Sequence, residues 1–131
     1  DEVCYSTGLL NTDICQVLRG ADISRTTNII ADSAEPKSID VIHGQGFNVY
    51  PCRKGRDSVR SGIDYMRSKP LMITSRSING IKELRNYKYK EDKNQRPLNE
   101  PIDAFNHFID ASRYAITFNA TNPNYGSYQL G

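Results

Sequence analysis

Apolar residues recur along the chain at two spacings, which predict an order of short strands and helices. Spacings of three and four residues, typical of one helix face, begin near Asn11, Pro36, Ser58, Ile78 and Pro101. Short or alternating apolar runs predict strands at 1–6, 28–31, 47–52 and 71–74, and 87–89 is left open between strand and loop. Strands that alternate with helices imply βαβ units and a largely parallel sheet.

The last predicted helix has the clearest pattern. It covers 101–118, with an apolar stripe at Ile102, Phe105, Ile109, Ser112 and Ile116. The charged segment 90–100 precedes it and is predicted to be a loop or a hairpin tip. The polar segment 119–131 is predicted to be a flexible tail, which leaves one domain at 1–118.

Composition narrows the class of protein only a little. A chain of 131 residues with 37% hydrophobic and 24% charged residues fits one globular domain. No apolar run approaches the roughly 20 residues of a membrane helix. The net charge of +2 does not by itself indicate a nucleic-acid partner. The three cysteines include no Cys-x-x-Cys pair, so we expect buried, reduced thiols rather than zinc ligands or disulfides.

Asp32 is the first candidate for chemistry because it directly follows the predicted strand 28–31. Working residues of parallel sheets gather beyond the carboxyl ends of the strands. A carboxylate held there suits a hard divalent cation, which prefers oxygen ligands. The alternative is structural, since an aspartate before a helix often caps the free backbone N–H groups.

A second candidate is the polar face of the last predicted helix. Asp103, His107, Asp110 and Tyr114 are separated by four, three and four residues, which places them along one side. A carboxylate and an imidazole one turn apart can share a site, where His107 would orient a water, move a proton or touch a metal. The alternative is a surface His–Asp pair with no function.

A basic loop lies between a predicted strand and the next helix. Its cations are Arg53, Lys54 and Arg56, and Gly55 allows close approach of the backbone to a phosphate. Cations beside a helix N-terminus favour anions, although a solvated loop is the other interpretation. No Gly-x-x-x-x-Gly-Lys-Ser/Thr motif occurs, so the sequence does not indicate ATP hydrolysis.

Four blocks in this order resemble the C-terminal nuclease domain of tailed-phage terminase large subunits. The blocks are 29–39, with the letters IIADSAEPKSI; 54–58 with Gly62-Ile63; Glu83-Leu84 with Tyr87 and Tyr89; and 106–115, with the letters NHFIDASRYA. The resemblance implies an α/β, RNase H-like fold, a mixed sheet flanked by helices. It also implies metal-binding aspartates at Asp32 and Asp110, with His107 beside the metals.

The resemblance further implies a function in viral DNA packaging. The activity would be endonucleolytic cleavage of concatemeric double-stranded DNA by two Mg²⁺ or Mn²⁺ ions, with Arg53, Lys54 and Arg56 on the DNA. Expected partners are an ATPase domain of the same polypeptide, the portal and the small terminase subunit, with no membrane. The expected location is the cytoplasm of a bacterial host that carries the phage or prophage.

One departure from the family pattern affects the expected activity. The family's first catalytic aspartate lies on a first strand upstream of the segment that matches 1–6, and no residue here fills that position. We therefore expect an N-terminally incomplete domain that alone binds metal poorly and cuts weakly or not at all. The alternatives are a catalytically incomplete RNase H-like module that binds DNA or packaging partners, and a resolvase or transposase relative.

Overall fold

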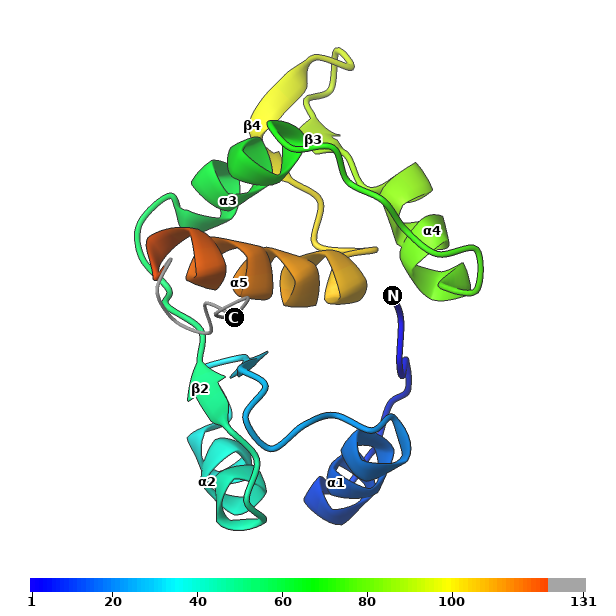
Figure 1. Ribbon diagram of the computed structural model, residues 1–131. Coiled ribbons are helices and arrows are strands. Elements are labelled where there is room, and N and C mark those ends of the chain that lie inside the picture. The colour runs from blue at the N-terminus through cyan, green and yellow to red at the C-terminus, as the bar shows by residue number, and fades with distance from the viewer. Residues whose placement is uncertain (123–131) are drawn as a thin grey trace.

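The computed structural model describes residues 1–122 and consists of short strands and helices (Figure 1). Their order is α1 (Asn11–Gly20), β1 (Ile29–Ala31), α2 (Pro36–Gly44), β2 (Val49–Pro51), α3 (Ser58–Arg67), α4 (Ile78–Asn86), β3 (Tyr89–Glu91), β4 (Pro97–Pro101) and α5 (His107–Thr121). The predicted helices from 11, 36, 58 and 78 and the strands within 28–31 and 47–52 are confirmed.

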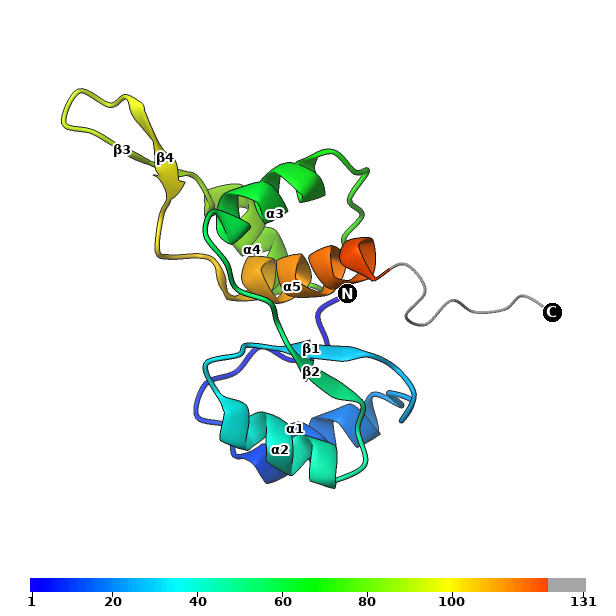
Figure 2. The ribbon, with the colours of Figure 1, turned by 90° about the vertical axis from the view of Figure 1, so that its left-hand side faces the viewer.

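The elements form two halves, which Figure 2 shows one above the other. The strand half contains α1, α2, β1 and β2, and the helix half contains α3, α4 and α5. β1 pairs in parallel with β2, with Ile30 opposite Tyr50, and α2 connects them as a βαβ unit. β3 and β4 form a separate antiparallel hairpin that projects from the helix half. The predicted parallel pairing is therefore confirmed for β1 and β2.

The strand half is built around an apolar core. Helices α1 and α2 bury one face each against the strands, and the buried core residues are Cys15, Ile39, Ile42, Phe47 and Val49. Phe47 is 2% exposed, and the guanidinium of Arg25 lies 4.2 Å from its ring centroid. This core fixes β1, and with it the position of the residue that follows, Asp32.

In the helix half, α5 packs closely against both neighbouring helices and also contacts β1 (Figure 1). A Cβ added at Gly62 of α3 would lie 2.7 Å from the Arg113 side chain of α5. A Cβ added at Gly80 of α4 would lie 2.9 Å from the Phe108 ring of α5. Only glycine permits these approaches, so they fix α5 against α3 and α4.

Three predicted elements differ from the structure. Residues 1–6 and 71–74 form no strand, and Leu71 and Met72 are exposed. The last helix begins at His107 rather than Pro101, because 97–101 belong to β4 and Phe105 has a left-handed φ of 54°. It ends at Thr121, past the predicted start of the tail, and residues 123–131 of that tail lie outside the described residues.

Cysteine placement agrees in part with expectation. Cys15 and Cys52 are buried free thiols, whereas Cys4 is exposed, so the prediction was wrong for Cys4. Between residues 1 and 122, no helix combines the length and the apolar character that crossing a bilayer requires.

Candidate metal centre

Asp32 leaves the end of β1 with its carboxylate at the junction of the two halves. Its Oδ1 accepts a hydrogen bond from the backbone N–H of Ala34 at 2.9 Å and lies 2.6 Å from Lys54 Nζ. Its Oδ2 accepts a bond from the Tyr114 hydroxyl at 3.4 Å. The N-cap of α2 is Glu35, so Asp32 is not the N-cap of that helix. Its side chain instead stabilises the turn before the helix by accepting the Ala34 N–H.

α5 faces Asp32 across this junction. Tyr114, which contacts Asp32 across 82 positions of sequence, lies one helical turn after Asp110. Burial raises the pKa of Tyr114, and the negative charges of Asp110 and Asp32 raise it further. Tyr114 thus contacts Asp32 directly and lies one helical turn from Asp110, so one phenol feels the charge of both predicted metal ligands.

Each of these carboxylates has a basic partner. Lys54 lowers the pKa of Asp32 through its hydrogen bond, the Ala34 N–H lowers it further, and Asp32 in turn raises the pKa of Lys54. This pair is a surface ion pair, because the Lys54 and Asp32 side chains are 49% and 46% exposed. Arg113 Nη2 lies 2.9 Å from Asp110 Oδ1, and Arg113 is buried.

Arg113 was not anticipated from the sequence, where it lies within the family-like block. Its guanidinium carbon lies 4.8 Å from the Tyr114 ring centroid, and its Nε has no hydrogen-bond partner within residues 1–122. The spacing of three from Asp110 was the available signal. A buried guanidinium holds its partner carboxylate in one orientation more firmly than a solvated lysine does.

His107 is the first residue of α5, and its side chain is directed to the N-terminal segment. Its ring meets the Tyr5 ring edge to face, with centroids 6.2 Å apart. Asp103 lies in the loop before α5, where it accepts a weak bond from Asn106. The predicted polar face therefore starts at His107, and Asp103 is not part of it.

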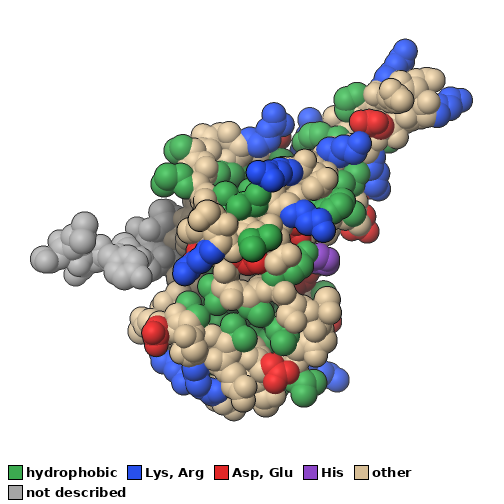
Figure 3. Space-filling view, turned by 90° about the vertical axis from the view of Figure 1, so that its right-hand side faces the viewer, with side chains coloured by type: hydrophobic (Ala, Val, Ile, Leu, Met, Phe, Trp, Pro, Cys, Tyr) green, Lys and Arg blue, Asp and Glu red, His purple; other side chains and the backbone are tan. Residues whose placement is uncertain are grey.

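The basic loop contributes one direct contact to the centre, through Lys54. Arg53 borders a hollow of about 270 Å³ between α3 and α5 that Arg113 and Tyr114 also line. Arg56 is exposed just before α3. Figure 3 shows that Lys and Arg are also frequent over the helix half and the hairpin on another face of the molecule.

The donor set fits part of a divalent-metal site. Carboxylate oxygens are the ligands that Mg²⁺ and Mn²⁺ prefer. Yet no group of three or more His, Cys, Asp or Glu side chains suited to a metal gathers anywhere in the described chain, residues 1–122. Asp32 and Asp110 are the two carboxylates that could contribute to such a site, and each is paired with a cation.

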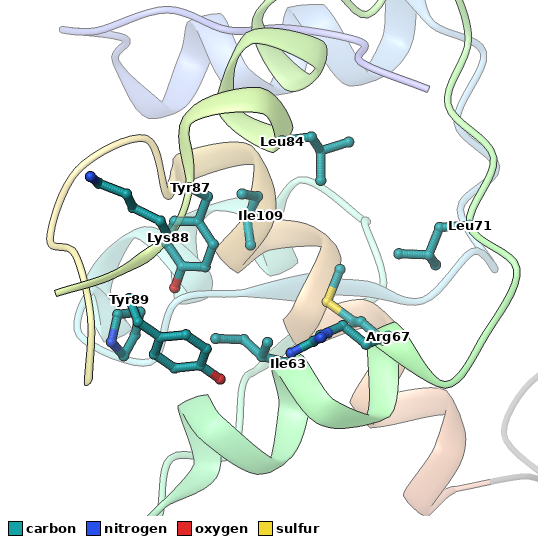
Figure 4. Close-up of a pocket in the computed structure, with 10 residues that line it drawn as sticks. Ile63, Arg67, Leu71, Leu84, Tyr87, Lys88, Tyr89 and Ile109 are labelled. Carbon is teal, nitrogen blue, oxygen red and sulfur yellow. The ribbon is translucent and has the colours of Figure 1, made fainter. Parts of the chain in front are cut away.

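A separate apolar hollow of about 400 Å³ lies between α3, α4 and the hairpin. Figure 4 shows Ile63, Leu84 and Ile109 around this space, with Tyr87 and Tyr89 at its side. No carboxylate lines it, so it is not a place for a divalent cation. Burial, followed by the charge of Asp110, raises the pKa of Tyr87, which lines this hollow.

Glu83 is a second residue of this region that the apolar pattern did not single out. Ile78, Ile81 and Leu84 predicted the helix itself, but Ile78 and Leu84 are exposed, whereas Gly80 and Glu83 are buried. The spacing of three between Gly80 and Glu83 was the available signal of this buried face. Glu83 is 2% exposed and binds the beginning of α5.

Comparison with known proteins identifies the family of this chain. The family model of the terminase RNase H-like domain matches residues 2–117. The chain is 38% identical over 95 residues to the terminase large subunit of Bacillus phage SPP1, covering 70% of this chain and 22% of that protein. It is 35% identical over 89 residues to the PBSX phage terminase large subunit of Bacillus subtilis strain 168, covering 67% and 21%.

A solved structure matches as well. The crystal structure of the nuclease domain of g2p, the large terminase of bacteriophage SPP1, with bound Mn, superposes with a TM-score of 0.76 at 29% identity. The match covers 86% of this chain and 65% of that one, whereas the chain spans only about a fifth of the curated relatives. Family model, relatives and fold agree, and the chain belongs to the terminase RNase H-like domain family.

Proposed function

We propose that this chain is a nuclease domain that cleaves double-stranded DNA with divalent metal ions during phage genome packaging. The observation that carries the proposal is the meeting of Asp32 and the Asp110 face of α5 at Tyr114. Family membership and a structural neighbour that holds Mn support it.

Asp32 and Asp110 would hold the ions, Mg²⁺ or Mn²⁺. When bound, such ions activate the attacking water and stabilise charge on the scissile phosphate. Lys54 lies 2.6 Å from Asp32, so its ammonium would meet a phosphate oxygen that approaches this carboxylate. Arg53 and Arg56 would extend the contact along the DNA backbone, and His107 would position a water or move a proton.

We further propose that the isolated chain binds metal weakly. Asp32 and Asp110 are joined by no third carboxylate within residues 1–122, and Lys54 and Arg113 already neutralise them. A complete centre would take a further carboxylate, as the family's first strand carries. In the virus, the expected partners are an ATPase domain of the same polypeptide, the portal and the small subunit, in the host cytoplasm.

Paramagnetic broadening by Mn²⁺ tests the shared site even at weak affinity. In an isotope-labelled sample, amide resonances beside Asp32 and beside Asp110 should broaden together during one titration. Asp32→Asn should abolish both effects, whereas Asp103→Asn, which removes a carboxylate outside the centre, should leave both unchanged. Broadening at only one aspartate, or insensitivity to Asp32→Asn, would refute the shared site.

Plasmid cleavage in Mn²⁺ tests the activity itself. We expect weak nicking at most from this chain, and strong cleavage abolished by Asp32→Asn would contradict the proposed weak metal binding.

A second candidate is a module that binds DNA or packaging partners without cutting. The pairing of both carboxylates with cations favours it, because such pairs need no metal. It predicts that DNA binding without metal survives Asp32→Asn and that millimolar Mn²⁺ produces no cleavage.

A further inference from the structure

The start of α5 is capped by a side chain from another helix. The first backbone N–H groups of a helix lack partners within it and need acceptors elsewhere. Here Glu83 of α4 takes them: Oε1 accepts from His107 at 3.1 Å, and Oε2 accepts from Phe108 at 2.7 Å and Ile109 at 3.1 Å. The helix's own N-cap residue, Asn106, makes no side-chain cap bond.

Charge and burial make this cap strong. A carboxylate at a helix N-terminus faces the positive end of the helix dipole. Glu83 is 2% exposed, and a fourth donor, the Tyr5 hydroxyl, also donates to Oε1 at 2.8 Å. All four partners are donors, so a glutamine here would direct its NH₂ group at another donor whichever way it turned.

The capped turn carries the candidate metal centre. Asp110 directly follows the three residues whose backbone N–H groups donate to Glu83. The N–H of Asp110 itself donates to the backbone carbonyl of Asn106. The close contact between Gly80 and Phe108 restrains the same turn from the side. Glu83 therefore limits both the sliding of α5 along its axis and its rotation, and these two movements would carry Asp110 away from Asp32.

A second carboxylate anchors α4 in turn. Glu2 accepts bonds from the Asn79 side chain at 2.8 Å and the Gly80 N–H at 2.7 Å, and its own N–H donates to Ser77. Glu83 is thus held in place by contacts of α4 that do not involve α5. An acceptor that positions another group needs such independent support.

We propose that Glu83 is a positioning residue of the metal centre, which holds Asp110 opposite Asp32 by capping α5 from α4. The proposal rests on the proposed function, in which those aspartates bind the metal. Glu83 itself touches neither ion nor DNA.

The test compares Glu83→Gln with two controls in the full chain. Tyr5→Phe removes the one partner of Glu83 outside α5, and Ile42→Val destabilises the strand half without touching the cap. At a temperature where all variants are folded, Glu83→Gln should raise the Mn²⁺ concentration for half-broadening beside Asp110 by roughly tenfold. Both controls should stay near the parent value. If Glu83→Gln does not fold, Glu83→Asp, which keeps the charge but is shorter, takes its place.

A metal-free measurement separates this inference from the proposed function. In the parent chain, Asp32→Asn should shift the ring resonances of Tyr114, because the two side chains are in contact. In a Glu83→Gln background that shift should largely disappear. A folded Glu83→Gln protein with an unchanged Tyr114 response and unchanged Mn²⁺ midpoint overturns the positioning role. Absence of Mn²⁺ binding in the parent chain refutes the proposed function instead, and the Tyr114 response still decides the role of Glu83.

Discussion

The two halves of the molecule are held together by different kinds of interaction. Every residue of the buried cluster in the strand half is apolar, from Cys15 to Val49. The buried polar residues, Ser77, Glu83 and Arg113, all lie in the helix half or at its edge. Asp32 comes from the first half and Asp110 from the second, so the candidate metal centre joins an apolar scaffold to a polar one.

This difference means that the two candidate ligands can be displaced independently. Loss of apolar volume should move Asp32, because its strand rests on that core. Loss of a hydrogen bond or a glycine contact should move Asp110, because α5 is fixed by Glu83, Gly62 and Gly80.

The largest expected effect is that of Phe47→Ala. Phe47 is 2% exposed and fills the centre of the strand half, so its removal leaves a cavity and should lower the free energy of unfolding by about 3–5 kcal/mol. Denaturant titration would measure the loss. Native-state hydrogen exchange should show faster exchange in α2 and β2 than in α5, and a uniform increase would contradict the division into halves.

Glu83→Ala should have the next largest effect. It leaves three N–H groups at the start of α5, at buried and part-buried bonds, without their acceptor, which we expect to lower the free energy of unfolding by about 2–3 kcal/mol. Exchange should accelerate first at His107, Phe108 and Ile109. If α2 lost protection as much as α5, the cap would be supporting the whole molecule rather than its helix half.

Gly62→Ala should lower the free energy of unfolding by about 1–2 kcal/mol. The reason is overpacking, because the new Cβ would lie 2.7 Å from the Arg113 side chain. Gly20→Ala is the matched control, because nothing lies within 4 Å of its Cβ position at the end of α1. Thermal unfolding of both variants gives the comparison. Equal melting temperatures would show that α3 and α5 adjust freely.

Tyr5→Phe should have the smallest effect, about 0.5–1 kcal/mol near neutral pH. The hydrogen bond to Glu83 raises the pKa of Tyr5, so its contribution is complete below the ordinary tyrosine pKa and is lost as pH rises through the raised value. The stability difference between parent and variant should therefore begin to fall at about pH 10, the ordinary tyrosine pKa, and be lost as the pH passes the raised pKa of Tyr5. A difference that persisted at the alkaline end would exclude this bond as its source.

The strand half was the more predictable of the two. The periodicity of Ile14, Ile39 and Ile42 and the apolar runs within 28–31 and 47–52 report burial directly, because apolar side chains form that core. In the helix half, burial of Glu83 and Arg113 gives no apolar signal, so the apolar spacing predicted α4 without indicating which of its faces is buried. The left-handed φ of Phe105, which delays the start of α5, likewise has no sequence signature.

The same limits apply to the candidate centre. The spacing of His107, Asp110 and Tyr114 predicted a shared helix face, and the meeting of that face with Asp32 followed only from the family resemblance. The ion pair of Lys54 with Asp32 joins residues far apart in sequence and has no local signal. The ion pair of Arg113 with Asp110 has one, because the two residues are three positions apart on one helix. The roles of these residues in binding metal and DNA stay predictions.

The anchoring of α4 by the N-terminal segment bears on the order in which the chain folds. Glu2 reaches Gly80 across 78 positions and Tyr114 reaches Asp32 across 82, whereas Asn28 and Asn48 beside the parallel strands are separated by 20. Closing longer loops has a larger entropic penalty, so we expect the strand half to form first and α5 to dock last. Pulse-labelling of amides during refolding should protect Ile42 before Ile109. A nascent chain would then keep its two candidate ligands apart until α5 has been synthesised and has docked.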